Sequence, residues 1–233
     1  MRLYIIRHAD PDYANRTITR QGHQEAHALA VRLQEYNLDT IVCSPLGRAQ
    51  HTARYTADAL KLPIETDAWL AELDIRMEDG GRSGVAAWNI AADRVRECVQ
   101  PEGALHLDAI PELQAPHIKS ALTFVAAESD RFFSSLGYER VGHRYWVVKS
   151  NPRQIAVFCH NGLGLTWLSH LLSIPTPLMW TTFWLSPSSV SAIVFEEHES
   201  GWATPRCICL GDTSHLSAAG LPVQTGGLTL NQY

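Results

Sequence analysis

Two histidines and two arginines in this sequence follow short apolar runs, and these residue types could hold an oxyanion and attack it. The run over residues 2–6 ends in Arg7 and His8, and the run over residues 154–159 ends in His160. The guanidinium of arginine is a planar fork of donors for phosphate-like oxygens. Histidine can act as nucleophile, base or acid near neutral pH. The strand ends are therefore the first candidates for chemistry.

The other arginine is expected at the start of a helix. Residues 39–43 are predicted to form a strand, and Ser44 and Pro45 after it are typical of a helix N-cap and a first helical position. Arg48 would then lie in the first turn of that helix. Its charge would add to the positive end of the helix dipole, which favours the binding of an anion.

Neighbouring parallel strands would bring these residues together, because the carboxyl ends of parallel strands share one edge of a sheet about 4.8 Å apart. His8 and His160 would then face each other across a gap of phosphoryl size. Phosphoryl transfer needs such parts, since arginines can hold the equatorial oxygens and a neutral imidazole can attack phosphorus. The arginines also favour the neutral imidazole, because they disfavour added positive charge.

A general acid is needed to protonate a leaving oxygen. Glu72 follows a short strand predicted over residues 63–65 and could reach the same edge. Asp74 and Glu78 lie close by in the sequence and remain alternatives for this role.

The alternation of strands with helices predicts an α/β fold. We expect a three-layer α/β/α sandwich with a mostly parallel central sheet, formed by residues 1–233 as a single domain. Thr19 is expected to cap a helix whose apolar residues recur at helical spacing. Further elements are predicted as a helix over residues 117–136, a helix after His160 that ends at Leu172, and strands over residues 190–195 and 203–210.

Residues 74–116 have a different character, with scattered glycines, prolines and charges. They predict an insertion, or cap, over the active-site edge of the sheet, with one helix at about residues 85–99. The tail from residue 211 is polar and rich in turn residues.

The composition narrows the class of protein. Of the 233 residues 45% are hydrophobic and 18% charged, which suits a globular protein with a sizeable core. The net charge of -5 makes nucleic acid an unfavoured partner. No stretch approaches the roughly 18 apolar residues of a membrane span. Only four apolar residues precede Arg7, so no signal peptide is predicted and a cytoplasmic location is expected.

The five cysteines are expected to be thiols in a reducing compartment. Cys207 and Cys209 alternate with Ile208, so a strand would place both on one face. Two further ligands at suitable spacing are missing, which favours packed thiols over a metal site.

Four motifs together resemble the histidine phosphatase superfamily of branch 1, the phosphoglycerate-mutase-like group. They occur in the order typical of the family, over residues 1 to about 165. The four motifs are Arg7-His8-Ala9, residues 19–26 (TRQGHQEA), residues 44–53 (SPLGRAQHTA) and His160-Asn161-Gly162.

The resemblance implies a role for each main candidate. His8 would be the phosphate-accepting nucleophile, and Arg7, Arg48 and His160 would form the phosphate pocket. Glu72 would be the proton donor. No metal or organic cofactor is implied, and the expected partner is a small phosphorylated substrate.

The sequence also departs from the family pattern. Ala9, Asp10 and Pro11 replace the usual glycine, glutamate and threonine, and Leu163 replaces a second glycine. The stretch after Glu72 lacks the usual tryptophan-glutamate-glycine group, which keeps the assignment of the acid open.

Other residues are weaker candidates for substrate contacts. Asn15 and Asn161 lie beside the motifs, although Asn15 is also a typical turn residue. Trp88 of the insertion could line a cleft, and His215 of the tail could lie at the edge of the site. Five arginines could bind a second anionic group or be ordinary surface residues: Arg76, Arg82, Arg94, Arg96 and Arg144.

The expected function is a phosphomonoesterase that acts through phosphohistidine on His8. A phosphoglycerate mutase is the first alternative, but mutases of this family carry an arginine directly after the acid, a nearby tyrosine and an arginine pair. Here Leu73 follows Glu72, no tyrosine occurs between residues 56 and 137, and no Arg-Arg pair exists. A non-catalytic phosphate-binding module is the second alternative, although all four pocket residues are present.

Overall fold

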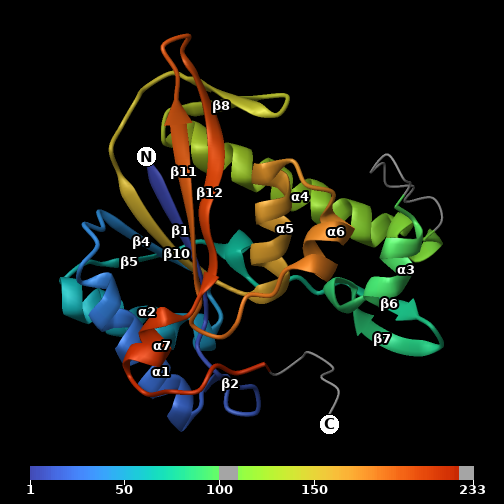
Figure 1. The fold of residues 1–233 in the computed structure, drawn as a ribbon, viewed down its shortest axis with the longest axis horizontal. Helices are drawn as coiled ribbons and strands as arrows, with labels where there is room; N and C mark the ends of the chain where they lie inside the picture. Colours follow the sequence, from blue (N-terminus) through green and yellow to red (C-terminus); the bar gives the residue numbers. More distant parts are fainter. Residues whose placement is uncertain (100–109, 226–233) are drawn as a thin grey trace.

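A central sheet of eight strands is flanked by helices on both faces (Figure 1). This computed structural model describes residues 1–99 and 110–225. In spatial order the strands are β5 (Ile64–Thr66), β4 (Thr40–Cys43), β10 (Gln154–Cys159), β1 (Arg2–Arg7), β11 (Val190–Glu197), β12 (Trp202–Asp212), β9 (Arg144–Val147) and β8 (Tyr138–Val141).

The helices divide between the two faces of the sheet and make the three layers that the sequence predicts (Figure 1). One face carries α1 (Arg20–Leu33), α2 (Gly47–Leu60) and α7 (Ser214–Ala218). The other face carries α4 (Pro116–Ser135), α5 (Asn161–Leu172) and α6 (Thr176–Thr182).

Strand β1 shows how the sequence builds both cores. Leu3 and Ile5 pack into the core that contains Trp167 of α5, whereas Tyr4 and Ile6 pack into the core under α1. Successive side chains of a strand point to opposite faces, so a continuous apolar run is needed where both faces are covered. The strand therefore reads as uniformly apolar up to Arg7.

The sheet is mixed, so the expectation of a mostly parallel sheet holds for one half. Strands β5, β4, β10 and β1 pair in parallel, and β1, β11, β12, β9 and β8 pair in antiparallel fashion. The antiparallel half contains the two strands β8 and β9, which the sequence analysis did not predict. The parallel half carries the strand ends with the candidate residues.

The starts of α1 and α2 differ from each other in how they are capped. Thr19 accepts a hydrogen bond from the Gly22 amide and caps α1, as predicted. The prediction of Ser44 as the N-cap of α2 is wrong, because α2 begins at Gly47 and its N-cap residue is Leu46. The side chain of Leu46 makes no capping hydrogen bond. The chain needs a glycine there, since a Cβ at Gly47 would lie 2.2 Å from the carbonyl oxygen of Arg16.

The predicted thiol pair lies on opposite faces of the sheet rather than on one. Cys207 packs with the α5-side core and Cys209 with the α1-side core. The register of β11 and β12 shifts between Ala192 and Ile193, so an extra residue of β12 separates the two cysteines. Such a bulge reverses the direction of the following side chain.

The insertion forms a hairpin and short helices at one end of the molecule (Figure 1). The helix predicted over residues 85–99 is mostly wrong, because the chain is extended up to Ala86 and only α3 is α-helical there. The elements are β6 (Arg76–Asp79), β7 (Arg82–Ala86), the 3₁₀ helix η2 (Ala87–Asn89), α3 (Ala92–Glu97) and the 3₁₀ helix η4 (Pro111–Gln114).

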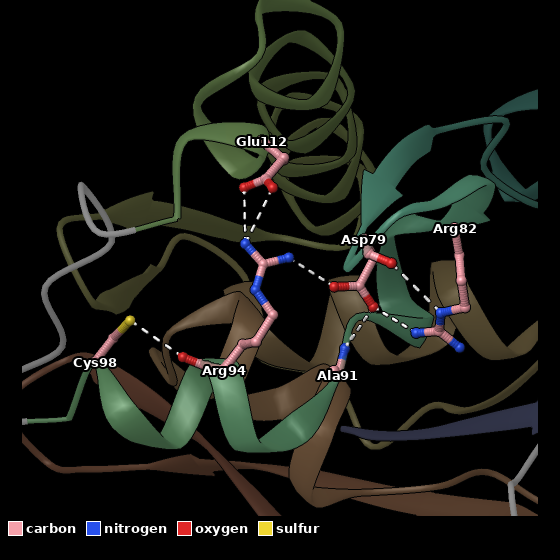
Figure 2. Close-up of polar contacts among 6 residues, drawn as sticks. All are labelled: Asp79, Arg82, Ala91, Arg94, Cys98 and Glu112. Carbon is pink, nitrogen blue, oxygen red and sulfur yellow. Dashed lines mark hydrogen bonds and ion pairs between the residues drawn. The ribbon is translucent and has the colours of Figure 1, made fainter.

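Asp79 ties these short elements together (Figure 2). Its fully buried carboxylate accepts hydrogen bonds from Arg94 (2.6 Å), Arg82 (2.6 Å) and the Ala91 amide (3.0 Å). Arg94 also bonds Glu112 at 3.0 Å. We call these four charged side chains the Asp79 anchor. A buried carboxylate is tolerable only when it is paired and hydrogen-bonded in this way.

No helix among residues 1–99 and 110–225 is long and apolar enough to cross a membrane.

The Asp79→Asn variant should loosen the insertion, because it removes the charge that Arg82 and Arg94 compensate. We expect a loss of about 1–3 kcal/mol in the local stability of β6, β7 and α3. Burial alone would raise the pKa of Asp79, but the bonds from Arg94 and Arg82 outweigh it and leave the pKa below its ordinary value. The contribution of Asp79 is therefore present above the ordinary aspartate pKa of about 3.9 and is lost as pH falls through the lowered value.

Amide hydrogen exchange of the wild type and the variant measures this effect. Asp74→Asn is the matched control, because Asp74 is exposed and pairs only loosely with Arg76 at 3.6 Å. Equal protection of the hairpin in wild type and Asp79→Asn would contradict the anchoring role.

Candidate active site

The ends of β1 and β10 place two histidines side by side. The two strands are parallel neighbours, and Arg7 is opposite Cys159 in their register. His8 and His160 follow directly, with ring centroids 5.1 Å apart. The short distance between the rings confirms the expectation that the two imidazoles meet at one edge of the sheet. Both rings are buried.

His8 is held as a neutral imidazole with one nitrogen free. Its Nδ1 lies 2.7 Å from the carbonyl oxygen of Ala9. A carbonyl only accepts, so Nδ1 carries the proton and Nε2 keeps its lone pair. Burial is the main cause that lowers the pKa of His8 well below its ordinary value, and Arg7 lowers it further. The free Nε2 is therefore unprotonated at neutral pH and can attack an electrophile.

His160 is oriented by Ser44. The distance from Ser44 Oγ to His160 Nε2 is 2.7 Å, and Ser44 Oγ also accepts from the Leu46 amide. This bond occupies Nε2 of His160, whereas its buried Nδ1 has no hydrogen-bond partner among the described residues and is left for a ligand. Burial, then His8, lowers the pKa of His160 well below its ordinary value.

Two arginines flank the histidines, and each lies near an aromatic ring. The Arg7 guanidinium is 5.1 Å from the centre of the Trp184 ring, and that of Arg48 is 5.4 Å from the centre of the Tyr13 ring. Arg48 is in the first turn of α2, as predicted. The buried Nε atoms of both arginines lack protein partners, which leaves them available to an anion.

Glu72 reaches this edge from the segment after β5. Its Oε1 accepts from the Leu163 amide (2.8 Å) and its Oε2 from the Gly162 amide (3.1 Å), at the N-terminus of α5. Burial raises the pKa of Glu72 above its ordinary value, against the opposing effect of these amides. A raised pKa favours a carboxyl group that can donate a proton.

The two alternatives for the acid lie elsewhere. Asp74 is exposed, and Glu78 is exposed and accepts a bond from Ser83. Neither of them lines the pocket that contains His8, whereas Glu72 does.

Arg7, His8, Arg48 and Glu72 line a pocket of about 470 Å³, whereas His160 is not among its lining residues. The insertion forms one wall, where Trp88 lies so close to α5 that a Cβ at Gly162 would be 2.5 Å from its ring. The other lining residues come from the strand ends, the loop after β1, the segment before β11 and the tail: Asp10, Pro11, Tyr13, Leu73, Arg76, Ala86, Asn89, Asn161, Trp184, Pro187 and Gln224.

The segment over residues 184–189 is part of the site, although the sequence analysis did not select it. Leu185 accepts a hydrogen bond from Arg7 through its carbonyl oxygen and donates one from its amide to Asn161. The segment precedes β11, which is antiparallel to β1. The start of an antiparallel strand lies at the same edge as the carboxyl end of its neighbour. Recognition of the antiparallel pairing would have revealed this wall.

Ser188 of this segment links His8 to the tail. Its backbone has a positive φ of 59°, and its amide donates to the carbonyl oxygen of His8 at 3.1 Å. Its hydroxyl lies 3.0 Å from Nε2 of His215 in α7. Strained backbone of this kind persists only where its surroundings hold it.

The weaker candidates have different positions. Asn161 and Trp88 line the pocket. Asn15 does not, since it is exposed and bonds Asp12 in a turn. His215 lies in a separate hollow of about 1010 Å³ beside α1, and burial lowers its pKa to about 4. The hydrogen bond with Ser188 links His215 to the site.

Within the described ranges 1–99 and 110–225, no group of three or more His, Cys, Asp or Glu side chains could hold a metal ion.

Part of the chain is similar in sequence to a known protein family. Residues 3–97 match the model of the histidine phosphatase superfamily (branch 1). Among curated proteins, the chain is 32% identical over 84 residues to the Probable phosphoglycerate mutase GpmB of Enterobacter sp. (strain 638) and 33% to that of Yersinia enterocolitica. These matches cover 32% of this chain and span only 39% of the length of each relative.

Solved structures resemble the whole fold. A phosphoserine phosphatase variant of Entamoeba histolytica in complex with phosphoserine is 18% identical with a TM-score of 0.59, covering 92% of this chain and 98% of that one. The alpha-ribazole phosphatase of Shigella flexneri is 20% identical with a TM-score of 0.59, covering 91% and 97%. A mycobacterial glucosyl-3-phosphoglycerate phosphatase is 20% identical with a TM-score of 0.55, covering 90% and 98%.

Over residues 3–97, less than half of its length, the chain is similar to the histidine phosphatase superfamily (branch 1). The solved structures named above share its fold and are phosphatases, and the curated relatives are probable phosphoglycerate mutases.

The His215→Ala variant should lower kcat for an aryl phosphate by about fivefold to tenfold, the value of one lost hydrogen bond. The reason is that Ser188, and with it the backbone of His8, loses its support, while KM should change little. In a Ser188→Gly background, which tolerates the positive φ and lacks the hydroxyl, His215→Ala should have no further effect.

His170→Ala is the matched control, because His170 also makes one hydrogen bond, to Asp130 at 2.8 Å, but lies outside the pocket. Equal losses in the two histidine variants, or additive losses with Ser188→Gly, would contradict the positioning role.

Proposed function

We propose that this protein is a phosphomonoesterase that hydrolyses a small phosphorylated metabolite through a phosphohistidine on His8. The observation that carries the proposal is the neutral, buried His8 with Nε2 free, beside two arginines and a second histidine. The substrate phosphate would lie between His8 and the donors of Arg7, Arg48 and His160. These donors would stabilise the charge that spreads over the equatorial oxygens.

The first step forms the bond between Nε2 of His8 and phosphorus and breaks the bond from phosphorus to the ester oxygen. The carboxyl group of Glu72 gives its proton to the departing oxygen, which leaves as the alcohol. Glu72 becomes a carboxylate, which the amides at the start of α5 then stabilise. The positive charge on the phosphorylated imidazole is offset by the phosphoryl oxygens.

The second step hydrolyses the phosphoenzyme. The carboxylate of Glu72 takes a proton from water, the water oxygen bonds to phosphorus, and the bond to Nε2 breaks. Inorganic phosphate is released, and His8 and Glu72 return to their starting states. A phosphatase is favoured over a mutase because Leu73 stands where mutases of this family have an arginine.

The His8→Ala variant should lose all measurable turnover of p-nitrophenyl phosphate, because Nε2 of the neighbouring His160 is already bonded to Ser44 and cannot replace that of His8. Rapid quench of the wild type with labelled substrate should trap an acid-labile phosphoenzyme that the variant does not form. His170→Ala should form it at the wild-type level. Full activity in His8→Ala would overturn the proposed mechanism.

The pH profile should report Glu72 and His8 separately. Activity requires protonated Glu72, whose pKa is raised, and is lost on the alkaline side as pH rises through it. It also requires neutral His8, whose pKa is well below its ordinary value, and is lost only at lower pH. We therefore expect an optimum on the acid side of neutrality.

The Glu72→Gln variant should lower kcat for alkyl phosphates by about 10²–10⁴-fold and remove the alkaline limb. With p-nitrophenyl phosphate, whose leaving group needs no proton, it should still give a burst of nitrophenol followed by slow turnover. Asp74→Asn is the control and should behave as wild type. An unchanged alkaline limb in Glu72→Gln would assign the acid elsewhere.

A further inference from the structure

We infer that the departing alcohol carries a second anionic group, a carboxylate or another phosphate, which Arg76 binds. The inference rests on the proposed hydrolysis at His8 and concerns the part of the pocket that phosphate does not fill. Within the described residues, the arginines that line the pocket are Arg7, Arg48 and Arg76, and Arg76 also lines a smaller hollow beside it. The first two flank His8, so Arg76 is left for the remainder of the substrate.

The position of Arg76 is fixed at its backbone. It begins β6 and is opposite Ala86, which also lines the pocket. Its carbonyl oxygen lies 2.9 Å from Nε2 of His117. The side chain alternates outward while Met77 and Asp79 point into the insertion. These contacts fix the backbone of Arg76 at the edge of the pocket.

The side chain of Arg76, in contrast, is held loosely. Its Nε is 3.6 Å from Asp74, and both side chains are largely exposed, at 59% and 92%. Its Nη1 is 3.4 Å from the carbonyl oxygen of Gly84, at the long end for a hydrogen bond. An exposed ion pair of this kind contributes little. Arg76 can therefore exchange Asp74 for an anion of the substrate at small cost.

The other arginines proposed from the sequence for a second anion are engaged outside the pocket. Figure 2 shows Arg82 and Arg94 directed at Asp79, with Glu112 on the far side of Arg94. The remaining two are occupied by polar or aromatic partners, namely Thr182 for Arg96 and the Trp202 ring for Arg144.

The acidic residues of the pocket do not neutralise Arg76. The carboxylate of Asp10 accepts a hydrogen bond from Thr19, and that of Glu72 is held by amides of α5. A cation without a committed acidic partner in a pocket favours an anionic ligand, since a guanidinium bonds carboxylate or phosphate with two parallel donors. Neutral groups of Asn89 and Asn161 complete that part of the wall.

Matched alkyl phosphates test the inference. Each pair differs only in charge: a terminal carboxylate against the carboxamide, and a terminal phosphate against the hydroxyl. Each is made with spacers of two, three and four carbons, so that the length suited to the pocket is sampled. The release of inorganic phosphate gives kcat/KM for wild type, Arg76→Gln, Arg76→Lys and Arg96→Gln.

We expect wild type to prefer the anionic member of at least one pair by about tenfold or more, in line with a charge-assisted hydrogen bond. Arg76→Gln should reduce this preference to about twofold or less, and Arg76→Lys should restore part of it. Arg96→Gln, a change in another arginine of the insertion, should retain the preference. The carboxylate and phosphate pairs separately identify which anion is bound.

The inference is overturned if wild type prefers neither anion, or if the preference survives in Arg76→Gln. The comparison of each anionic substrate with its own neutral partner in the same variant isolates this result from the chemistry at His8, because a general loss of turnover lowers both members of a pair alike. If the protein turns over no phosphoester at all, the proposed hydrolysis is contradicted, but the inference about Arg76 is still testable by binding. Calorimetric binding of the same pairs to His8→Ala then tests Arg76 without catalysis.

Discussion

The site depends on keeping two imidazoles neutral beside two guanidinium groups in a buried place. Burial and the positive charge of Arg7 act in the same direction on the pKa of His8, so that its Nε2 keeps a lone pair at the place where we propose that the phosphate binds. The same conditions would be costly for a protonated ring. The surrounding structure meets this constraint. Carbonyl, hydroxyl and amide groups hold the two rings and Glu72 in place, and among the described residues no carboxylate bonds either histidine.

Backbone groups hold several of these side chains in position. The carbonyl oxygen of Ala9 selects the tautomer of His8, and the amide of Ser188 holds the carbonyl of His8 itself. Amides at the start of α5 receive Glu72, which comes from a distant part of the chain. Rigid elements therefore set the geometry, and side chains of the insertion and the loops supply the remaining walls.

The part of the site that lies on strand ends could be predicted from the sequence, because an apolar run that stops at Arg7 or His160 signals its own end. The helix capped by Thr19 was equally visible from its spacing. Ser44 was misplaced because its hydroxyl bonds His160, a tertiary contact that local patterns do not contain. The antiparallel half of the sheet and the segment over residues 184–189 depend on pairings between distant strands, and the β12 bulge that separates the two thiols has no local signal.

The Asp79 anchor has a consequence for how such a protein can diversify. All four charged groups of the anchor belong to residues 74–116, so the insertion carries its own internal support. It meets the rest of the molecule through apolar packing, with Trp88 against Gly162 of α5 and Val95 in the core that contains Trp167. Sequence changes within the insertion, or its replacement by another segment of similar shape, can therefore alter which alcohol the pocket binds. The residues at the strand ends that we propose to react would not change.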